Sequence, residues 1–248
     1  MTTATTASGK FSIRRIDAPF TQRSVFDTPP VQGCVLATPS MQRRLPDAPL
    51  VRRCVFDVGD AAVSVTTSCR LDPRTYSQVL HAVRAEFTCT DRSRGGPDPR
   101  TVDPGVDLSG ARAMAVDAAG RILVAAGIEN WCVTAGGDVL TCGPAPVHGE
   151  PWAVGITEPG GDALISQAVC RGDLRAVSTV TADSLDAAAG TLFSQVTVVA
   201  PDIMTARLLA AGIRDGDSSD LLLAIARGCE VLAFTADGRA WASSAFRA

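Results

Sequence analysis

The sequence predicts an α+β fold, with helices packed on a mixed or antiparallel sheet. Short runs of apolar and β-branched residues, of strand length, outnumber the helical segments. A few helices fall between groups of strands, which is typical of α+β folds. Of the 248 residues, 46% are hydrophobic, enough for one substantial core or two small ones.

Residues 1–53 are predicted to form a Pro-rich, partly disordered N-terminal arm, and residues 54–248 a single domain. The first ten residues are rich in Thr, Ala and Ser and offer little apolar surface to bury. Prolines then recur as far as Pro49. The regular elements are therefore expected to begin just after this arm.

The domain is expected to open with two strands and two helices. Residues 51–67 are predicted to form two strands joined by a turn at Gly59-Asp60. Residues 72–87 carry apolar side chains at helical spacing. A polar loop rich in Gly, Pro and Arg is expected over residues 91–104, and a second helix over residues 109–126.

The second half is expected to consist mostly of strands. A Gly-Gly-Asp turn marks a hairpin within residues 130–142. Residues 195–200 are β-branched and form the expected central strand. Pro201 is expected in the first turn of a helix that ends at Ala211. The other predicted elements are strands at 152–157, 163–169 and 174–180, a short helix at 221–228, and a hairpin of 230–235 and 239–243.

Composition argues against several classes of function and location. The net charge is −3 and no dense Lys/Arg face offsets the acids, which argues against a nucleic-acid partner. No window approaches the roughly 18 apolar residues of a membrane span. The N-terminus has no apolar run after a basic start, so we expect a cytoplasmic protein. The eight cysteines include no C-x-x-C pair, which favours free thiols over disulfides or a metal cluster.

Two turns that carry Gly and Asp are the candidate binding elements. One runs from Asp107 to Gly110 and opens the helix at 109–126; the other is Gly136-Gly137-Asp138. Backbone N–H groups and carboxylates in such turns can hold a phosphorylated ligand, and we predict that both turns meet at one pocket. Alternatively, Asp107 is only a helix N-cap, and the second turn is only a hairpin.

Two arginines follow these turns on predicted helices. Arg112 and Arg207 can clamp a diphosphate, because a guanidinium binds phosphate oxygens bidentately. The alternative is that both are solvated arginines on helix surfaces. The sequence assigns no catalytic residue and no metal ligand.

The order of six motifs resembles the FAD:protein FMN transferase family, also called the ApbE or flavin transferase family. The family's Gly-Gly-Asp turn is intact, and so is its Pro-Trp-x-Val-Gly-Ile strand, at residues 151–156. Val58-Gly59-Asp60 is similar to the family's Met-Gly-Thr turn, and residues 107–117 to its Asp-Leu-Gly-Gly turn and following helix. Residues 176–179 and 196–201 are similar to its Thr-Ser-Gly turn and late central strand.

The resemblance implies a flavin-transferase-like domain over residues 54–248. It also implies an activity, in which FMN moves from FAD to a Thr or Ser hydroxyl of an acceptor flavoprotein. A phosphoester forms and AMP leaves. FAD and FMN are thus the implied ligands, and the implied cofactor-binding residues are Gly59, Asp60, Asp107, Gly110, Arg112, Gly136, Gly137, Asp138, Thr179 and Arg207.

The sequence departs from the family where the metal and a candidate base are expected. The family binds Mg²⁺ through an Asp and a Thr four residues later, and these positions fall on Arg207 and Ala211. A guanidinium cannot ligate Mg²⁺, and alanine offers no oxygen. The family's His-containing segment falls on residues 183–190, which lack His. The alternative to an active transferase is a relative that binds a flavin nucleotide or a partner protein without transfer.

Overall fold

The computed structural model describes residues 5–6, 9–10, 14–16, 50–58, 61–94, 108–146, 149–159, 161, 163–182, 191–216, 218–243 and 246–247. The helices are α1 (Pro73–Arg94), α2 (Leu108–Ala125), α3 (Ile203–Asp215) and α4 (Ser218–Ala226). The strands are β1 (Thr5–Thr6), β2 (Gly9–Lys10), β3 (Arg14–Ile16), β4 (Leu50–Val58), β5 (Ala61–Cys69), β6 (Asn130–Ala135), β7 (Asp138–Cys142), β8 (Trp152–Thr157), β9 (Leu164–Cys170), β10 (Leu174–Thr181), β11 (Phe193–Ala200), β12 (Glu230–Thr235), β13 (Ala240–Ala242) and β14 (Phe246–Arg247).

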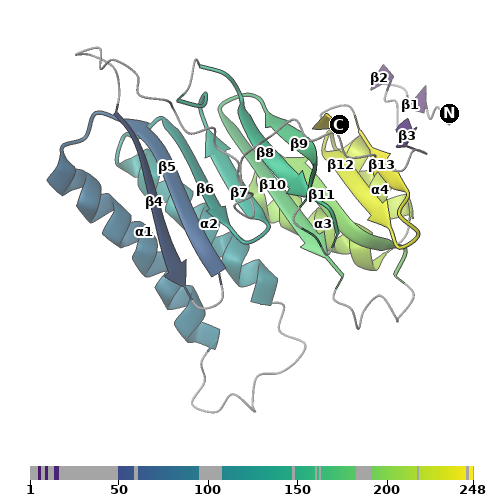
Figure 1. Cartoon of the computed structure of the whole chain (residues 1–248), viewed down its shortest axis with the longest axis horizontal. Helices are drawn as coiled ribbons and strands as arrows, with labels where there is room; N and C mark the ends of the chain where they lie inside the picture. The colour runs from purple at the N-terminus through teal and green to yellow at the C-terminus, as the bar shows by residue number, and fades with distance from the viewer. Residues whose placement is uncertain are drawn as a thin grey trace.

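A nine-stranded sheet forms the centre of the fold, in the order β3-β13-β12-β11-β10-β7-β6-β5-β4. All its neighbouring strands are antiparallel, so the predicted α+β class is confirmed in its antiparallel form. The four helices cover one face of this sheet (Figure 1). The three-stranded sheet β14-β9-β8 covers part of the other face.

The order of elements divides the fold into two similar halves. One half runs β4-β5-α1-α2-β6-β7 and the other β10-β11-α3-α4-β12-β13, each with two helices between two strand pairs. The halves meet where β7 pairs with β10. Strands β8 and β9 lie between β7 and β10 in sequence. Strands β7 and β10 are therefore joined by backbone hydrogen bonds and not by a tight turn.

Small residues let α2 approach the sheet closely. A Cβ at Gly120 would lie 2.8 Å from both the Trp131 and the Leu140 side chains, so any larger residue would push the helix away. Trp131 is fully buried in the core between helices and sheet. Trp152 is buried in a second core, between the two sheets.

The start of α3 differs from the sequence prediction. Pro201 was expected in the first helical turn, but it precedes the N-cap residue, Asp202. The Asp202 carboxylate accepts hydrogen bonds from the backbone N–H and the hydroxyl of Thr205, both at 2.8 Å. An Asp at the cap satisfies a donor that the helix leaves unpaired, and therefore fixes where the helix begins.

Two further boundaries also differ. Helix α1 continues to Arg94, so residues 91–94, expected in a polar loop, are helical. These four residues are polar but include neither Gly nor Pro, and Gly95 is the first helix-breaking residue after them. Gly110, expected in a bend, lies in the first turn of α2, which already begins at Leu108.

Strand β11 contains a bulge near its start. Its register with β12 shifts between Phe193 and Gln195, which leaves Ser194 as the extra residue. The Ser194 hydroxyl donates a hydrogen bond to the carbonyl of Phe234, 3.2 Å away. The bulge lets Phe193 pack with the helices while Gln195 faces the opposite side of the sheet.

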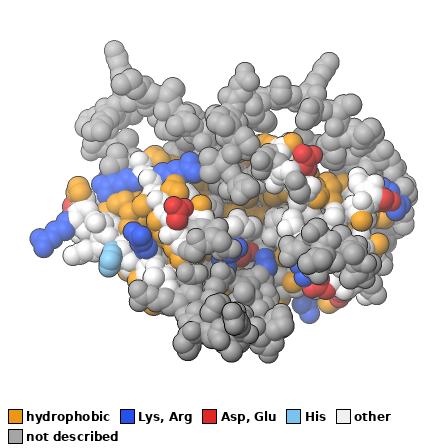
Figure 2. Space-filling model, turned by 60° about the horizontal axis from the view of Figure 1, so that its bottom comes forward, with side chains coloured by type: hydrophobic (Ala, Val, Ile, Leu, Met, Phe, Trp, Pro, Cys, Tyr) orange, Lys and Arg blue, Asp and Glu red, His pale blue; other side chains and the backbone are white. Residues whose placement is uncertain are grey.

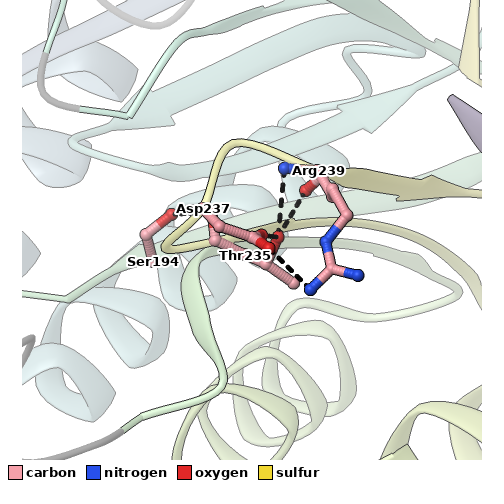
Figure 3. Close-up of polar contacts among 4 residues, drawn as sticks. All are labelled: Ser194, Thr235, Asp237 and Arg239. Atoms are coloured by element: carbon pink, nitrogen blue, oxygen red, sulfur yellow. Dashed lines mark hydrogen bonds and ion pairs between the residues drawn. The ribbon is translucent and has the colours of Figure 1, made fainter. Parts of the chain in front are cut away.

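The turn between β12 and β13 lies close to this bulge (Figure 3). Arg239 and Thr235 both donate hydrogen bonds to the carboxylate of Asp237, and they lower the pKa of Asp237 from 3.8 to about 2. The Arg239 backbone N–H also donates to the Thr235 hydroxyl, at 3.1 Å. These contacts close the predicted Asp-Gly hairpin.

Among the described residues on the face seen in Figure 2, basic and acidic side chains are scattered among hydrophobic and uncharged ones. Within the described part of the chain, no helix is long and apolar enough to cross a membrane.

We expect the Asp202→Ala variant to lower the free energy of unfolding by about 1 kcal/mol, the usual cost of removing an N-cap. Urea denaturation followed by circular dichroism measures the difference. Asp202→Asn is the matched control, because an amide oxygen can still accept from Thr205, and it should lose less. An Ala variant as stable as the wild type would contradict the assigned cap.

Candidate functional site

Seven of the ten predicted cofactor-binding residues lie in the described part of the chain. Gly59, Asp60 and Asp107 lie outside the described residues. The other seven come from α2, the β6–β7 hairpin, β10 and α3, which all meet where the two halves of the fold join. They are Gly110, Arg112, Gly136, Gly137, Asp138, Thr179 and Arg207.

The first turns of α2 lie against the β6–β7 hairpin. An added Cβ at Gly136 would lie 2.6 Å from Nη1 of Arg112 and 3.4 Å from its Cδ, so the arginine packs directly over this glycine. Gly136 has a φ of +58°, a conformation that other residues adopt only with strain. The helix start and the Gly-Gly-Asp turn are therefore adjacent in space.

Gly137 brings the hairpin close to β10. The Thr179 N–H donates to the Gly137 carbonyl at 2.8 Å. A Cβ at Gly137 would lie 2.4 Å from the backbone carbonyl oxygen of Thr179, which leaves no space for a side chain. Glycine is thus required at position 137 because the two halves of the fold are in close contact there.

A buried polar cluster lies just beyond this turn. The side chain of Asp138 is 2% exposed and accepts a hydrogen bond of 2.6 Å from the Ser178 hydroxyl. Nη1 of Arg207, on α3, lies 3.9 Å from Oδ1 of the same carboxylate, and the Arg207 side chain is only 13% exposed. Arg207 is therefore mostly shielded from solvent and not a fully solvated surface arginine, and it forms an ion pair with the buried carboxylate of Asp138.

A cavity of about 280 Å³ opens on the other face of the same strands. One wall is β8 of the small sheet, and the other combines the glycine turn with β7, β10 and β11. None of its lining residues is charged; they are Gly136, Gly137, Val139, Val154, Gly155, Ile156, Thr157, Val177, Thr179, Thr181 and Gln195. The cavity can accept an uncharged group that has both apolar and hydrogen-bonding surface.

Gln195 is the residue of this cavity that sequence reasoning missed. It is 2% exposed, and its Nε2 donates a hydrogen bond to the carbonyl of Thr157, 3.0 Å away, across the gap between the sheets. The available signal was a polar amide in an otherwise apolar, β-branched strand. The hydroxyls of Thr179 and Thr197 lie 2.9 Å apart on the neighbouring strands, so this wall is polar.

The α3 residues Arg207 and Ala211 lack the oxygen ligands that Mg²⁺ needs at these positions. Among the described residues, no three His, Cys, Asp or Glu side chains lie close enough together to hold a metal ion. At the positions where the resemblance implied ligands, Arg207 carries a positive charge and Ala211 has no side-chain oxygen. Mg²⁺ requires oxygen ligands, so this donor set does not fit it.

Comparisons with known proteins agree with the fold. The chain matches the family model described as the ApbE family over residues 72–214. Its structure is similar to that of the flavin transferase ApbE from Vibrio cholerae, with a TM-score of 0.57 and 18% identity, over 79% of this chain and 97% of that one.

Two other solved structures are similar to the same extent. The apo flavinyl transferase ApbE from Pseudomonas stutzeri has a TM-score of 0.56 and 14% identity, over 81% of this chain and 96% of that one. The ApbE protein from Thermotoga maritima has a TM-score of 0.53 and 19% identity, over 77% and 96%. No curated protein matches the chain in sequence. At sequence identities this low, the structural similarity shows that these proteins and this chain share a fold.

We expect Gly137→Ala to destabilise the protein by at least about 2 kcal/mol, because the new methyl group would overlap a backbone carbonyl that cannot move alone. Gly212→Ala is the matched control: nothing lies within 4 Å of the added carbon, and alanine should stabilise helix α3 by up to about 1 kcal/mol. Thermal unfolding of both variants measures the contrast. Equal melting temperatures would mean that the hairpin and β10 are not in close contact.

Proposed function

Because the chain belongs to the ApbE family, we propose that it binds a flavin nucleotide and works as an FAD:protein FMN transferase-like protein. The substrates would be FAD and a Thr or Ser hydroxyl of an acceptor flavoprotein, and AMP would be the product released. A cytoplasmic location is part of the same proposal.

One observation carries the proposal: the first turns of α2, the Gly-Gly-Asp hairpin and α3 converge at the junction of β7 and β10. All three elements fall within the matched residues 72–214, except for the last residue of α3, Asp215. These three elements, which carry predicted cofactor-binding residues, are therefore neighbours in space, as a shared ligand site requires.

The two sides of this junction suit different parts of a flavin nucleotide. The cavity offers threonine hydroxyls, a glutamine amide and apolar side chains, which suit an uncharged heteroaromatic ring. A phosphate placed there would meet no cation among the lining residues. Arg112 lies against the glycine turn, where its guanidinium could bind phosphate oxygens.

A second candidate function is binding of the nucleotide, or of a partner protein, without transfer. The observation that favours it is the donor set around Arg207, which does not fit Mg²⁺. Phosphoryl transfer depends on cations that stabilise the charge developing on the phosphate oxygens. A chain that lacks the metal could retain binding and lose the chemical step.

We expect FAD to bind the full chain, and the change in flavin fluorescence on titration measures the affinity. The Arg112→Ala variant should bind FAD at least about tenfold more weakly, because a charge-assisted hydrogen bond contributes about 1.5–3 kcal/mol. Arg121→Ala is the matched control. Arg121 lies on the same helix, is 74% exposed and pairs with Asp117, away from the hairpin. AMP formation with a Thr-bearing acceptor would then separate transfer from binding alone.

Two results would count against the proposal. Absence of any fluorescence change up to millimolar FAD would exclude a flavin nucleotide as ligand. Equal loss of affinity in the Arg112 and Arg121 variants would place the nucleotide away from the hairpin.

A further inference from the structure

We propose that Arg207 is a built-in cation that replaces a divalent metal ion at the start of β7, so that this chain binds its nucleotide independently of Mg²⁺. The part concerning the nucleotide rests on the proposed function. The part concerning the metal involves the residues of the chain alone and can be tested without any flavin.

The first step of the argument is the buried charge of Asp138. A carboxylate removed from water is strongly destabilising unless it is paired and hydrogen-bonded. Ser178 supplies the hydrogen bond, and Arg207 supplies a positive charge 3.9 Å from Oδ1. The guanidinium therefore already provides the compensation that a bound cation would give to this carboxylate.

The second step is that a metal ion is disfavoured at the same place. A divalent ion near Asp138 would be repelled by the guanidinium of Arg207. One helical turn later, Ala211 lies on the same side of α3 and offers no oxygen. Elsewhere among the described residues, no cluster of His, Cys, Asp or Glu side chains could hold the metal ion instead.

The third step is that α3 holds the guanidinium in place. The N-cap Asp202 fixes the start of the helix, and the buried residues Ile203, Ala206, Ala210 and Ile213 fix its face against β10 and β11. Arg207 follows Ala206 on this anchored helix. Because the guanidinium is covalently part of the chain, it cannot dissociate from the site as a metal ion can.

The fourth step concerns the ligand. Arg207 and Arg112 approach opposite ends of the same Gly-Gly-Asp turn, from α3 and from α2. A diphosphate at this turn would thus meet fixed guanidinium groups and not an exchangeable ion. The affinity for a nucleotide should therefore depend on the presence of these two arginines and not on the concentration of Mg²⁺.

The test begins with the full wild-type chain. Isothermal titration with MgCl₂ should give no binding heat up to about 10 mM, a level at which any ion held by charged ligands in a preformed site would be detected. The affinity for FAD should agree within about twofold between EDTA and excess MgCl₂. The double variant Arg207→Asp with Ala211→Thr should bind Mg²⁺ and gain melting temperature when MgCl₂ is added.

A matched control tests position. Leu208→Asp with Ala211→Thr places the same new groups on α3 with the carboxylate one residue away, on a side chain that is 67% exposed. It should gain no Mg²⁺ binding. If the Arg207→Asp variant does not fold, Arg207→Met takes its place; it should bind FAD at least about tenfold more weakly, with or without MgCl₂.

Binding of Mg²⁺ by the wild-type chain, or FAD binding that appears only with Mg²⁺, would overturn the inference while leaving the proposed function intact. A chain that binds neither Mg²⁺ nor FAD would leave Arg207 as the resident cation but refute the proposed function. Equal behaviour of the two double variants would show that the position of Arg207 is not special.

Discussion

The buried carboxylate of Asp138 is the constraint around which this part of the molecule is organised. It lies at the start of β7, where the two halves of the fold meet. Its compensation comes from elements of the second half: the Ser178 hydroxyl on β10 and the Arg207 guanidinium on α3. Because a buried charge is costly unless it is paired, these contacts favour the association of the two halves.

The glycine turn before Asp138 makes this arrangement possible. Gly137 allows the hairpin to approach the backbone of β10, and Gly136 leaves room for Arg112. The same strands form one wall of the cavity on the opposite face, which Gln195 connects to β8. A single junction thus combines fixed positive charge on one side with an uncharged, partly polar cavity on the other.

The sequence predicted the elements better than the relations between them. Strand 152–157 agrees with β8 in both bounds, and the helix predicted at 109–126 differs from α2 by one residue at each end. The position of Pro201 was wrong because Asp202 competes as the cap. Burial of Arg207 and the cavity-facing orientation of Gln195 could not be predicted, since they depend on a long-range ion pair and on a bulge at Ser194. Neither the ion pair nor the bulge can be recognised from the periodicity of hydrophobic residues along the sequence.

The most direct test of the ion pair is a double-mutant cycle on Asp138 and Arg207, with Asp138→Asn and Arg207→Met measured singly and together by urea denaturation. If the two groups compensate each other, each single variant removes the opposite charge that its partner faces, and the double variant should recover part of the loss, with a coupling of at least about 1 kcal/mol. Losses that add to within about 0.5 kcal/mol would show that the pair is not coupled. That result would contradict the role of Arg207 as the resident cation of this site.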